Sequence, residues 1–155
     1  MSGNAYKRRM RKETTVGFTV LELMVVTCIA GLLLTLWLPR AARLMDWLKT
    51  ERARRDITTA LAVARHGAVQ QATRARLTIS ADTLRIDRLN AGGWTPWWRL
   101  PGPASHGVLL QVSNPVVVFG PSGIGWGASN TKVVVSRGSQ AETITVSRVG
   151  RVKIW

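Results

Sequence analysis

The stretch that decides the fold is Gly17-Phe18-Thr19-Val20-Leu21-Glu22, which opens an apolar run over residues 18 to 38. The run contains 21 residues. A helix of that length would extend roughly 31 Å at about 1.5 Å per residue. This length matches the hydrocarbon core of a bilayer, which is about 30 Å thick. The sequence therefore predicts one membrane-spanning helix over residues 18–38.

Glu22 is the only charged residue within this apolar run. An ionisable side chain inside a membrane span costs about 2.5–3.5 kcal/mol on insertion scales, and such a residue usually has a partner and a function. The basic stretch Lys7-Arg8-Arg9-Met10-Arg11-Lys12 precedes the run, and the small residue Gly17 stands at its front edge. A secretory signal has the reverse order, because its small-residue cleavage site follows the apolar core.

Together these residues resemble the type III signal of prepilins, with a basic leader, Gly before the cut, Phe after it, and Glu as the fifth residue of the processed chain. The resemblance implies that a membrane-embedded prepilin peptidase cuts between Gly17 and Phe18 and methylates the new amino terminus. It also implies that Glu22 neutralises the terminal amine of a neighbouring subunit during filament assembly. A cut at this position would create a cation one helical turn from Glu22, within the spacing at which side groups on a helix meet.

Two other interpretations of the amino-terminal segment stay open. The segment could be a plain transmembrane anchor in which Glu22 is accidental. It could also be a conventional signal peptide cut near Ala41-Ala42, although Pro39-Arg40 stands where small uncharged residues are expected. Basic residues flank the run on both sides, so charge counting leaves the orientation ambiguous. The signal motif, and not the charge rule, predicts that most of the chain lies outside the cytoplasm.

The chain of 155 residues is strongly basic, with 22 Lys and Arg against 8 Asp and Glu and a formal net charge of +14. Loss of the leader would remove five basic residues and one acidic residue, which leaves +10. Such an excess implies affinity for polyanions, solubility at low salt, or both. Of the 22 cations 17 are arginines, whose forked guanidinium binds phosphate in a way that lysine cannot.

Apolar periodicity predicts the remaining elements. After Pro39 a helical spacing resumes, with Ile57, Leu61, Ala64 and Ala68 at three- and four-residue steps, so one long helix kinked at the proline is expected. Beyond residue 75 apolar and polar residues alternate, which indicates strands. A hairpin turn is expected at Ala81-Asp82 and a second turn at Asn90-Ala91-Gly92-Gly93. Strands are expected at 77–79, 84–86, 108–112, 116–119, 132–136, 143–148 and 152–154.

Further residues resemble the GspH/FimT family of pseudopilins and minor pilins. They are Leu61, Ala64-Arg65 and Ala68 within residues 56–68, then Trp94, Trp98, Val118-Phe119-Gly120-Pro121-Ser122-Gly123 and Val149-Gly150-Arg151-Val152-Lys153. The resemblance implies an α+β, pilin-like fold with a long amino-terminal helix packed on antiparallel β-sheets. The chain would then comprise a leader (1–17), a transmembrane helix half (18–38), an amphipathic helix half (39–74) and a β-rich domain with a basic tail (75–155).

The same resemblance implies a location and partners. The chain would be a single-pass protein of the bacterial inner membrane with its domain in the periplasm. It would enter a pilus or pseudopilus together with other pilins.

Catalysis finds little support in the sequence. His66 and His106 are the only histidines, and the carboxylates show no pairing at an informative spacing. Cys28, the sole cysteine, lies inside the apolar run, and no Cys/His cluster suggests a metal. The glycine-rich residues 120–127 lack the phosphate-loop pattern and are expected to form a structural or interaction loop. We therefore expect no enzymatic activity, no metal and no cofactor.

The carboxyl-terminal tail carries the candidate binding residues. If residues 150–155 are extended, Arg151, Lys153 and Trp155 share one side, and the two apolar residues between them point to the other. Two cations and an indole on one face can neutralise backbone phosphates while the ring stacks on a base or packs on a sugar. We expect Arg148 and Arg137 to widen this surface. Lys132, in a neighbouring expected strand, completes the set of candidate binding residues.

A resemblance supports the same residues. In the FimT branch a terminal Gly-Arg-x-Arg motif is associated with DNA binding during natural transformation, and Gly150-Arg151-Val152-Lys153 differs from it only in its last residue. Lysine keeps the charge but loses the bidentate fork, so a point contact to phosphate is expected. The alternative is a solvated edge strand whose charges only prevent aggregation.

Three tryptophans, Trp94, Trp97 and Trp98, lie around Pro96. They could offer stacking platforms for single strands or a docking surface for another pilin. Packing in the core or in a loop is favoured, because buried aromatic side chains dominate the energetics of small domains.

The combined hypothesis is a minor type IV pilin that binds DNA non-specifically through its basic carboxyl-terminal surface, for DNA uptake in natural transformation. Sequence readout is not expected, since no recognition helix or known base-reading motif is present. The alternative is a type II secretion pseudopilin without DNA binding, whose positive surface would meet other subunits or lipid.

Overall fold

The computed structural model describes residues 17–127 and 129–155. The chain divides into two units between Leu38 and Pro39. One helix, α1 (Val20–Gln70), runs through this boundary and contains Pro39. The expected leader lies outside the described residues, apart from Gly17.

The first unit contains the amino-terminal part of α1. By length and composition, α1 is the one helix of the described residues that is long and apolar enough to cross a membrane. Thr27 and Thr35 are the polar hydroxyls inside this stretch. They donate to the backbone carbonyls of Met24 at 2.9 Å and Leu32 at 2.7 Å. Neither hydroxyl is therefore left unsatisfied among the surrounding apolar side chains.

In the second unit the rest of α1 buries one stripe of mostly small residues at the predicted three- and four-residue steps. The stripe consists of Thr50, Ala53, Ile57, Ala60, Leu61, Ala64, Gly67 and Ala68. The helix ends at Gln70, four residues before the predicted end. Ala72 adopts a left-handed conformation (φ 47°), and the N–H of Thr73 bonds back to the carbonyl of Ala68 at 3.1 Å. This reversal resembles a Schellman cap and stops the helix.

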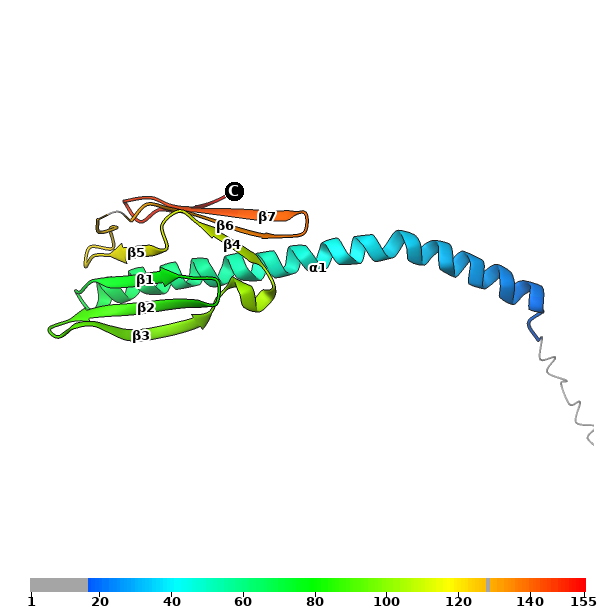
Figure 1. Cartoon of the computed structure of the whole chain (residues 1–155), viewed down its shortest axis with the longest axis horizontal. Helices are drawn as coiled ribbons and strands as arrows, with labels where there is room; N and C mark the ends of the chain where they lie inside the picture. The colour runs from blue at the N-terminus through cyan, green and yellow to red at the C-terminus, as the bar shows by residue number, and fades with distance from the viewer. Residues whose placement is uncertain (1–16, 128) are drawn as a thin grey trace, which may run out of the picture. The chain divides into compact units, whose positions relative to one another are not determined.

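Two four-stranded antiparallel sheets pack against this part of α1 (Figure 1). The first has the order β3-β2-β1-β5 and the second the order β4-β6-β7-β8. Their bounds are β1 (Ala75–Ile79), β2 (Thr83–Asn90), β3 (Gly93–Pro101), β4 (Leu109–Val112), β5 (Val116–Phe119), β6 (Thr131–Arg137), β7 (Gln140–Val146) and β8 (Val152–Ile154). A 3-10 helix, η1 (Pro103–His106), lies between β3 and β4. A long helix on antiparallel sheets confirms the predicted α+β, pilin-like class.

The core lies between α1 and the inner faces of the sheets. Its largest fully buried side chains include Phe119, Ile57, Leu61, Leu77, Leu84, Ile86, Ile144 and Val133. Along each central strand these residues alternate with less buried ones, as expected for strands that cover a core on one face only.

No strand was predicted at the position of β3, which contains Pro96. Proline cannot donate a ladder hydrogen bond, and within sheets it is confined to edges and bulges. The structure provides both conditions: β3 is the edge of its sheet, and Pro96 pairs with Asp87 beside a shift in register. The predicted strand at 143–148 also moves to Gln140–Val146, since residues 147–150 form the following turn.

Candidate functional site

A row of residues crosses the outer face of the second sheet. In the strand register Lys132 of β6 stands opposite Thr145 of β7, and Thr145 stands opposite Lys153 of β8. Residues directly opposite each other point to the same side of a sheet. Val133 and Ile144, their neighbours along the strands, are fully buried on the other side. Two lysines therefore share the outer face with one threonine between them.

The turn after β7 returns the tail along β7, on the side of that strand away from Lys132. Gly150 adopts a left-handed conformation (φ 74°), and its N–H bonds to the carbonyl of Ser147 at 2.9 Å. A Cβ on Gly150 would lie 2.8 Å from the carbonyl oxygen of Gly123. Both the backbone angle and the close contact favour glycine here. Gly150 of the predicted Gly-Arg-x-Lys motif thus has a structural function.

Three cations surround one polar hollow of about 490 Å³. Its lining includes the side chains of Lys132, Arg151 and Lys153 and the hydroxyl-bearing residues Ser113, Thr145 and Ser147. The Oγ of Ser113 accepts a hydrogen bond from the N–H of Lys132 at 2.8 Å, and the Oγ of Ser147 accepts from the N–H of Arg151 at 3.2 Å. A hydroxyl that accepts a bond keeps one O–H donor. The hollow therefore combines positive charge with neutral donors, as a phosphate-binding site requires.

Trp155 lies on the same side of the tail as Lys153. The Nζ of Lys153 is 3.4 Å from the centroid of the Trp155 ring, and this cation–π contact orients the indole. Trp155 also pairs with Thr143, because its N–H donates to the carbonyl of Thr143 at 3.0 Å. The indole remains 67% exposed. The structure thus brings Lys153 and Trp155 together as strand alternation predicts.

Two predicted residues do not join this group. Arg137 belongs to the face of β6 that carries the buried Val135, where its Nε donates to Asp46 of α1 at 2.8 Å. Its Nη1 donates to the carbonyl of Gly107 at 2.6 Å. Arg137 therefore connects β6 with α1 and with the end of η1 and lies apart from the tail surface. Arg148 is exposed on the turn after β7, and it does not line the hollow.

A larger, mostly apolar groove of about 1030 Å³ lies between α1 and the tail. Val69 of α1 and Val152 and Ile154 of β8 contribute to its lining. Arg65 also lines it, and its Nη1 donates to the carbonyl of Gly150 at 3.4 Å. Arg151 lines both this groove and the polar hollow. The sequence did not predict this groove, because it depends on how the tail lies over the helix.

The tryptophan cluster divides between two faces. Trp97 and Trp98 are half-buried and pack against the core, where Trp97 fits closely on Gly67 of α1. Trp94 lies near Arg76, whose guanidinium carbon is 4.6 Å from the centroid of the Trp94 ring. Core packing, the favoured interpretation, therefore holds for two of the three residues.

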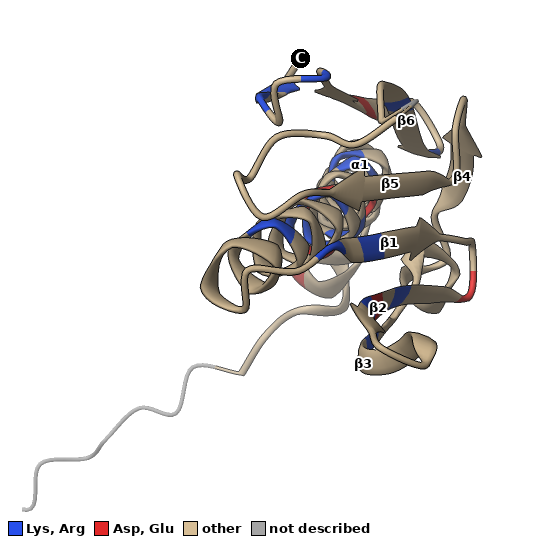
Figure 2. Cartoon of the chain, turned by 90° about the vertical axis from the view of Figure 1, so that its left-hand side faces the viewer, with Lys and Arg blue, Asp and Glu red and all other residues tan. Residues whose placement is uncertain are grey.

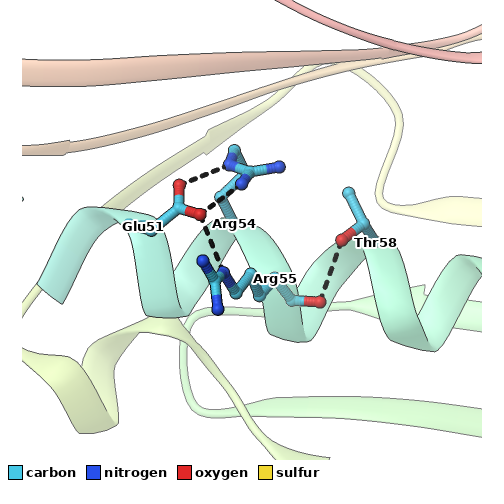
Figure 3. Close-up of polar contacts among 4 residues, drawn as sticks. All are labelled: Glu51, Arg54, Arg55 and Thr58. Atoms are coloured by element: carbon cyan, nitrogen blue, oxygen red, sulfur yellow. Dashed lines mark hydrogen bonds and ion pairs between the residues drawn. The ribbon is translucent and has the colours of Figure 1, made fainter. Parts of the chain in front are cut away.

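The arginines of α1 are partly neutralised by a carboxylate (Figure 3). Glu51 accepts from the Nε of Arg54 at 2.7 Å and from the Nε of Arg55 at 2.8 Å. The hydrogen bonds from Arg54 lower the pKa of Glu51 from 4.5 to about 2. The same contact raises the pKa of Arg54. This part of the helix is therefore a less effective anion site than its arginine count implies.

The expected processing site lies at the start of α1. The Phe18 side chain is 76% exposed, and open space surrounds Gly17. Thr19 caps the helix, a structural role that the sequence interpretation missed. Its Oγ1 accepts from the N–H of Glu22 at 3.2 Å, which is the side-chain bond of a helix N-cap. The spacing Thr19-x-x-Glu22 is the signature of a capping box and could have revealed this contact.

The similarity of this chain to known proteins lies in its fold. Neither a protein-family model nor a curated protein matches the chain. Among solved structures, it is similar to the type IV minor pilin FimU of Pseudomonas aeruginosa PAO1, with a TM-score of 0.58 and 16% identity over 68% of this chain and 87% of that one. It is also similar to the minor pseudopilin EpsH from the type 2 secretion system of Vibrio cholerae, with a TM-score of 0.57 and 14% identity over 69% and 96% of the two chains.

These two similarities define the fold class of the chain, which is pilin-like. The chain has a GspH/FimT-like pilin fold, as its sequence predicts.

Proposed function

We propose that this chain is a subunit of a type IV pilus. A prepilin peptidase cuts it after Gly17 and methylates Phe18, and residues 18–38 hold it in the inner membrane with the domain in the periplasm. The amino group on Phe18 of a neighbouring subunit then pairs with Glu22 during assembly. The pilin-like fold, the apolar first part of α1 and the prepilin-type signal support this assignment. The proposal includes no catalytic step and no cofactor.

Within that role the chain is a minor pilin that binds DNA non-specifically for uptake in natural transformation. The observation that supports this function is the convergence of Lys132, Arg151 and Lys153 around one polar hollow. Lys132 comes from β6 and the other two residues come from the tail, yet their charges meet on one face. Phosphate contacts carry no sequence information, so this surface would bind any duplex.

The chemistry of the hollow suits a phosphate. Arg151 can offer a planar fork of two N–H donors, while Lys132 and Lys153 act as point charges. The exposed indole of Trp155 can pack on a sugar or stack on a base. Arg148 serves as an outer contact, because its exposed position on the turn leaves it available to a long polyanion.

The test is DNA binding by the full chain in a non-ionic detergent, measured by fluorescence anisotropy with a short labelled duplex at several salt concentrations. Replacing Lys132, Arg151 and Lys153 with Ala removes three phosphate contacts. The slope of log affinity against log salt should then become shallower by about 2.7. The matched control replaces Arg40, Arg52 and Arg55 with Ala, which removes the same charge from α1. Equal losses in both proteins would reject the tail site.

A type II secretion pseudopilin without DNA binding is the second candidate. The likeness to EpsH and the apolar groove beside the tail favour it, because an apolar groove suits a protein subunit better than a polyanion. A full chain that shows no affinity for duplex DNA at low salt, but enters a pseudopilus, would support this candidate.

Assembly has its own test. Glu22→Gln should leave cleavage after Gly17 intact and reduce incorporation into filaments, since the buried amine of a neighbour loses its counter-charge. Mass spectrometry of the processed chain and immunoblots of sheared filaments measure the two steps separately. Normal incorporation of the variant would reject the role of Glu22.

A further inference from the structure

The outer face of the first sheet carries a second group of cations, away from the tail. Arg76 on β1 and Arg85 on β2 alternate with fully buried residues that face α1. Arg99 on β3 stands directly opposite Arg85, so it shares their side of the sheet. Arg74 precedes Arg76 by two positions and continues the same face. We call these four residues the arginine face; Figure 2 shows Lys and Arg in blue on β1 and β2 as well as near the carboxyl terminus.

A buried carboxylate holds two of these arginines in place. The side chain of Asp87 is only 2% exposed, and its Oδ2 accepts from the Nη2 of Arg76 at 2.8 Å. Its Oδ1 lies 3.2 Å from the Nε of Arg85. This contact is an ion pair without a hydrogen bond, and the Arg85 side chain is 41% exposed, so part of its guanidinium remains accessible. Both arginines are therefore positioned before any ligand arrives, which lowers the entropy lost on binding.

The remaining arginines lack such compensation. Arg99 forms no ion pair within the part of the chain that the structure describes, and it faces Arg85 across the strands. Like charges directly opposite each other in a sheet are destabilising. One phosphate between Arg85 and Arg99 would offset this repulsion and accept hydrogen bonds from both guanidinium groups.

Indole rings orient two members of the face, Arg74 and Arg76. The guanidinium carbon of Arg74 is 3.8 Å from the centroid of the Trp126 ring, and that of Arg76 is 4.6 Å from the Trp94 ring. Stacking on a ring leaves the N–H groups at the edge of a guanidinium free to donate. Arg74, Arg76 and Arg85 are thus held by contacts within the chain, and Arg99 extends the face to β3. Neighbouring strands lie about 4.7–4.9 Å apart.

We propose that the arginine face is a second binding surface for the phosphate backbone of DNA, separate from the tail; this inference rests on the proposed function. Four arginines, Arg74, Arg76, Arg85 and Arg99, stand against the single carboxylate of Asp87, so the face keeps an excess of positive charge. A protein partner fits less well, because the cores of protein interfaces are depleted in charged residues. Each sheet then carries one DNA-binding surface, so a single subunit can contact DNA through either sheet.

The experiment measures duplex binding by the full chain in non-ionic detergent, with and without the three tail substitutions. Arg74→Gln with Arg99→Gln removes two cations of the face and leaves the Arg76–Asp87–Arg85 group intact. In both backgrounds the salt slope should become shallower by about 1.8, and affinity should fall about tenfold. Arg52→Gln with Arg55→Gln is the control of equal charge, and it should change the slope much less. Arg99→Lys keeps the charge without the fork and should recover part of the affinity.

The outcomes separate the two proposals. If the tail substitutions weaken binding but the face variant behaves like the helix control, the arginine face is rejected and the tail site stands. If only the face variant loses affinity, the face stands and the tail site fails. Binding of the chain to phosphatidylglycerol vesicles but not to duplex DNA would overturn the inference in favour of a lipid surface. Thermal unfolding of each variant by circular dichroism verifies that binding losses do not reflect unfolding.

Discussion

The tail surface and the arginine face hold their cations in different ways. The tail is a three-residue strand at the edge of its sheet, and its side chains are exposed. The Nζ of Lys153 lies over the ring of Trp155, and the turn after β7 brings the tail to the edge of the sheet that carries Lys132. On the arginine face, Arg76 and Arg85 lie on the central strands of the other sheet and are held by a buried carboxylate. Charge at an edge can change without loss of the fold, whereas charge over the core is part of the fold.

The largest expected effect comes from breaking the support of the arginine face. Asp87→Ala leaves the guanidinium groups of Arg76 and Arg85 crowded without a counter-charge. Removing one partner of a buried ion pair is strongly destabilising, so the free energy of unfolding should fall by about 3 kcal/mol. Urea unfolding of the full chain in detergent, followed by circular dichroism, measures it. Asp82→Ala, on an exposed turn, is the matched control and should change stability little.

The next largest effect tests whether the position of the tail depends on the turn at Gly150. Gly150→Ala places a Cβ 2.8 Å from the carbonyl of Gly123 in a left-handed conformation. We expect a loss of about 1–2 kcal/mol, felt mainly at the tail. Hydrogen exchange at β8 and duplex affinity should both report it, while exchange in β1 and β2 stays protected. Gly92→Ala has open space around it and serves as the control. Unchanged exchange at β8 would show that the turn tolerates the methyl group.

The sequence predicts the features that depend on residues close together in the chain. It does not predict those that depend on the pairing of distant segments. Helix α1 and seven of the strands follow from local periodicity, and the sharing of one face by Lys153 and Trp155 follows from alternation within a single strand. Strand β3 escaped because the tolerance for Pro96 depends on being at an edge, which is a property of the whole sheet.

The two basic surfaces differ in the same way in how far the sequence predicts them. Arg137 was expected to widen the tail surface, yet it and Lys132 are an odd number of positions apart along β6 and therefore lie on opposite faces of the strand. The arginine face escaped altogether, since it requires the register of β1, β2 and β3 and the position of Asp87. Short-range patterns thus revealed one basic surface, and only the strand pairing revealed the other.

A smaller effect sharpens the boundary of the tail surface. Arg137→Ala should leave duplex affinity close to that of an Arg52→Ala control, because Arg137 is engaged by Asp46 and by the carbonyl of Gly107. Stability should fall by about 1 kcal/mol through the loss of these bonds. Anisotropy and urea unfolding on the same samples measure the two quantities. A loss of affinity equal to that of Arg151→Ala would return Arg137 to the tail surface.

The smallest effect concerns α1. There Glu51 provides a counter-charge for Arg54 and Arg55, in contrast to the tail surface. The pKa of Glu51 is lowered to about 2 in the folded chain from an ordinary value of 4.5. Its pairs with Arg54 and Arg55 therefore stabilise the fold fully above pH 4.5, and this contribution is lost as the pH falls toward 2. Because such helical pairs are weak in water, the loss should be about 0.5 kcal/mol.

Glu51→Gln should remove this pH dependence without changing the behaviour of the tail. The difference in unfolding free energy between the parent chain and the variant should be constant above pH 4.5 and shrink below it. Urea unfolding in detergent over that pH range gives the difference directly. A difference that grows on acidification would mean that Glu51 is destabilising when ionised, and the arginines of α1 would then be as free to bind anions as those of the tail.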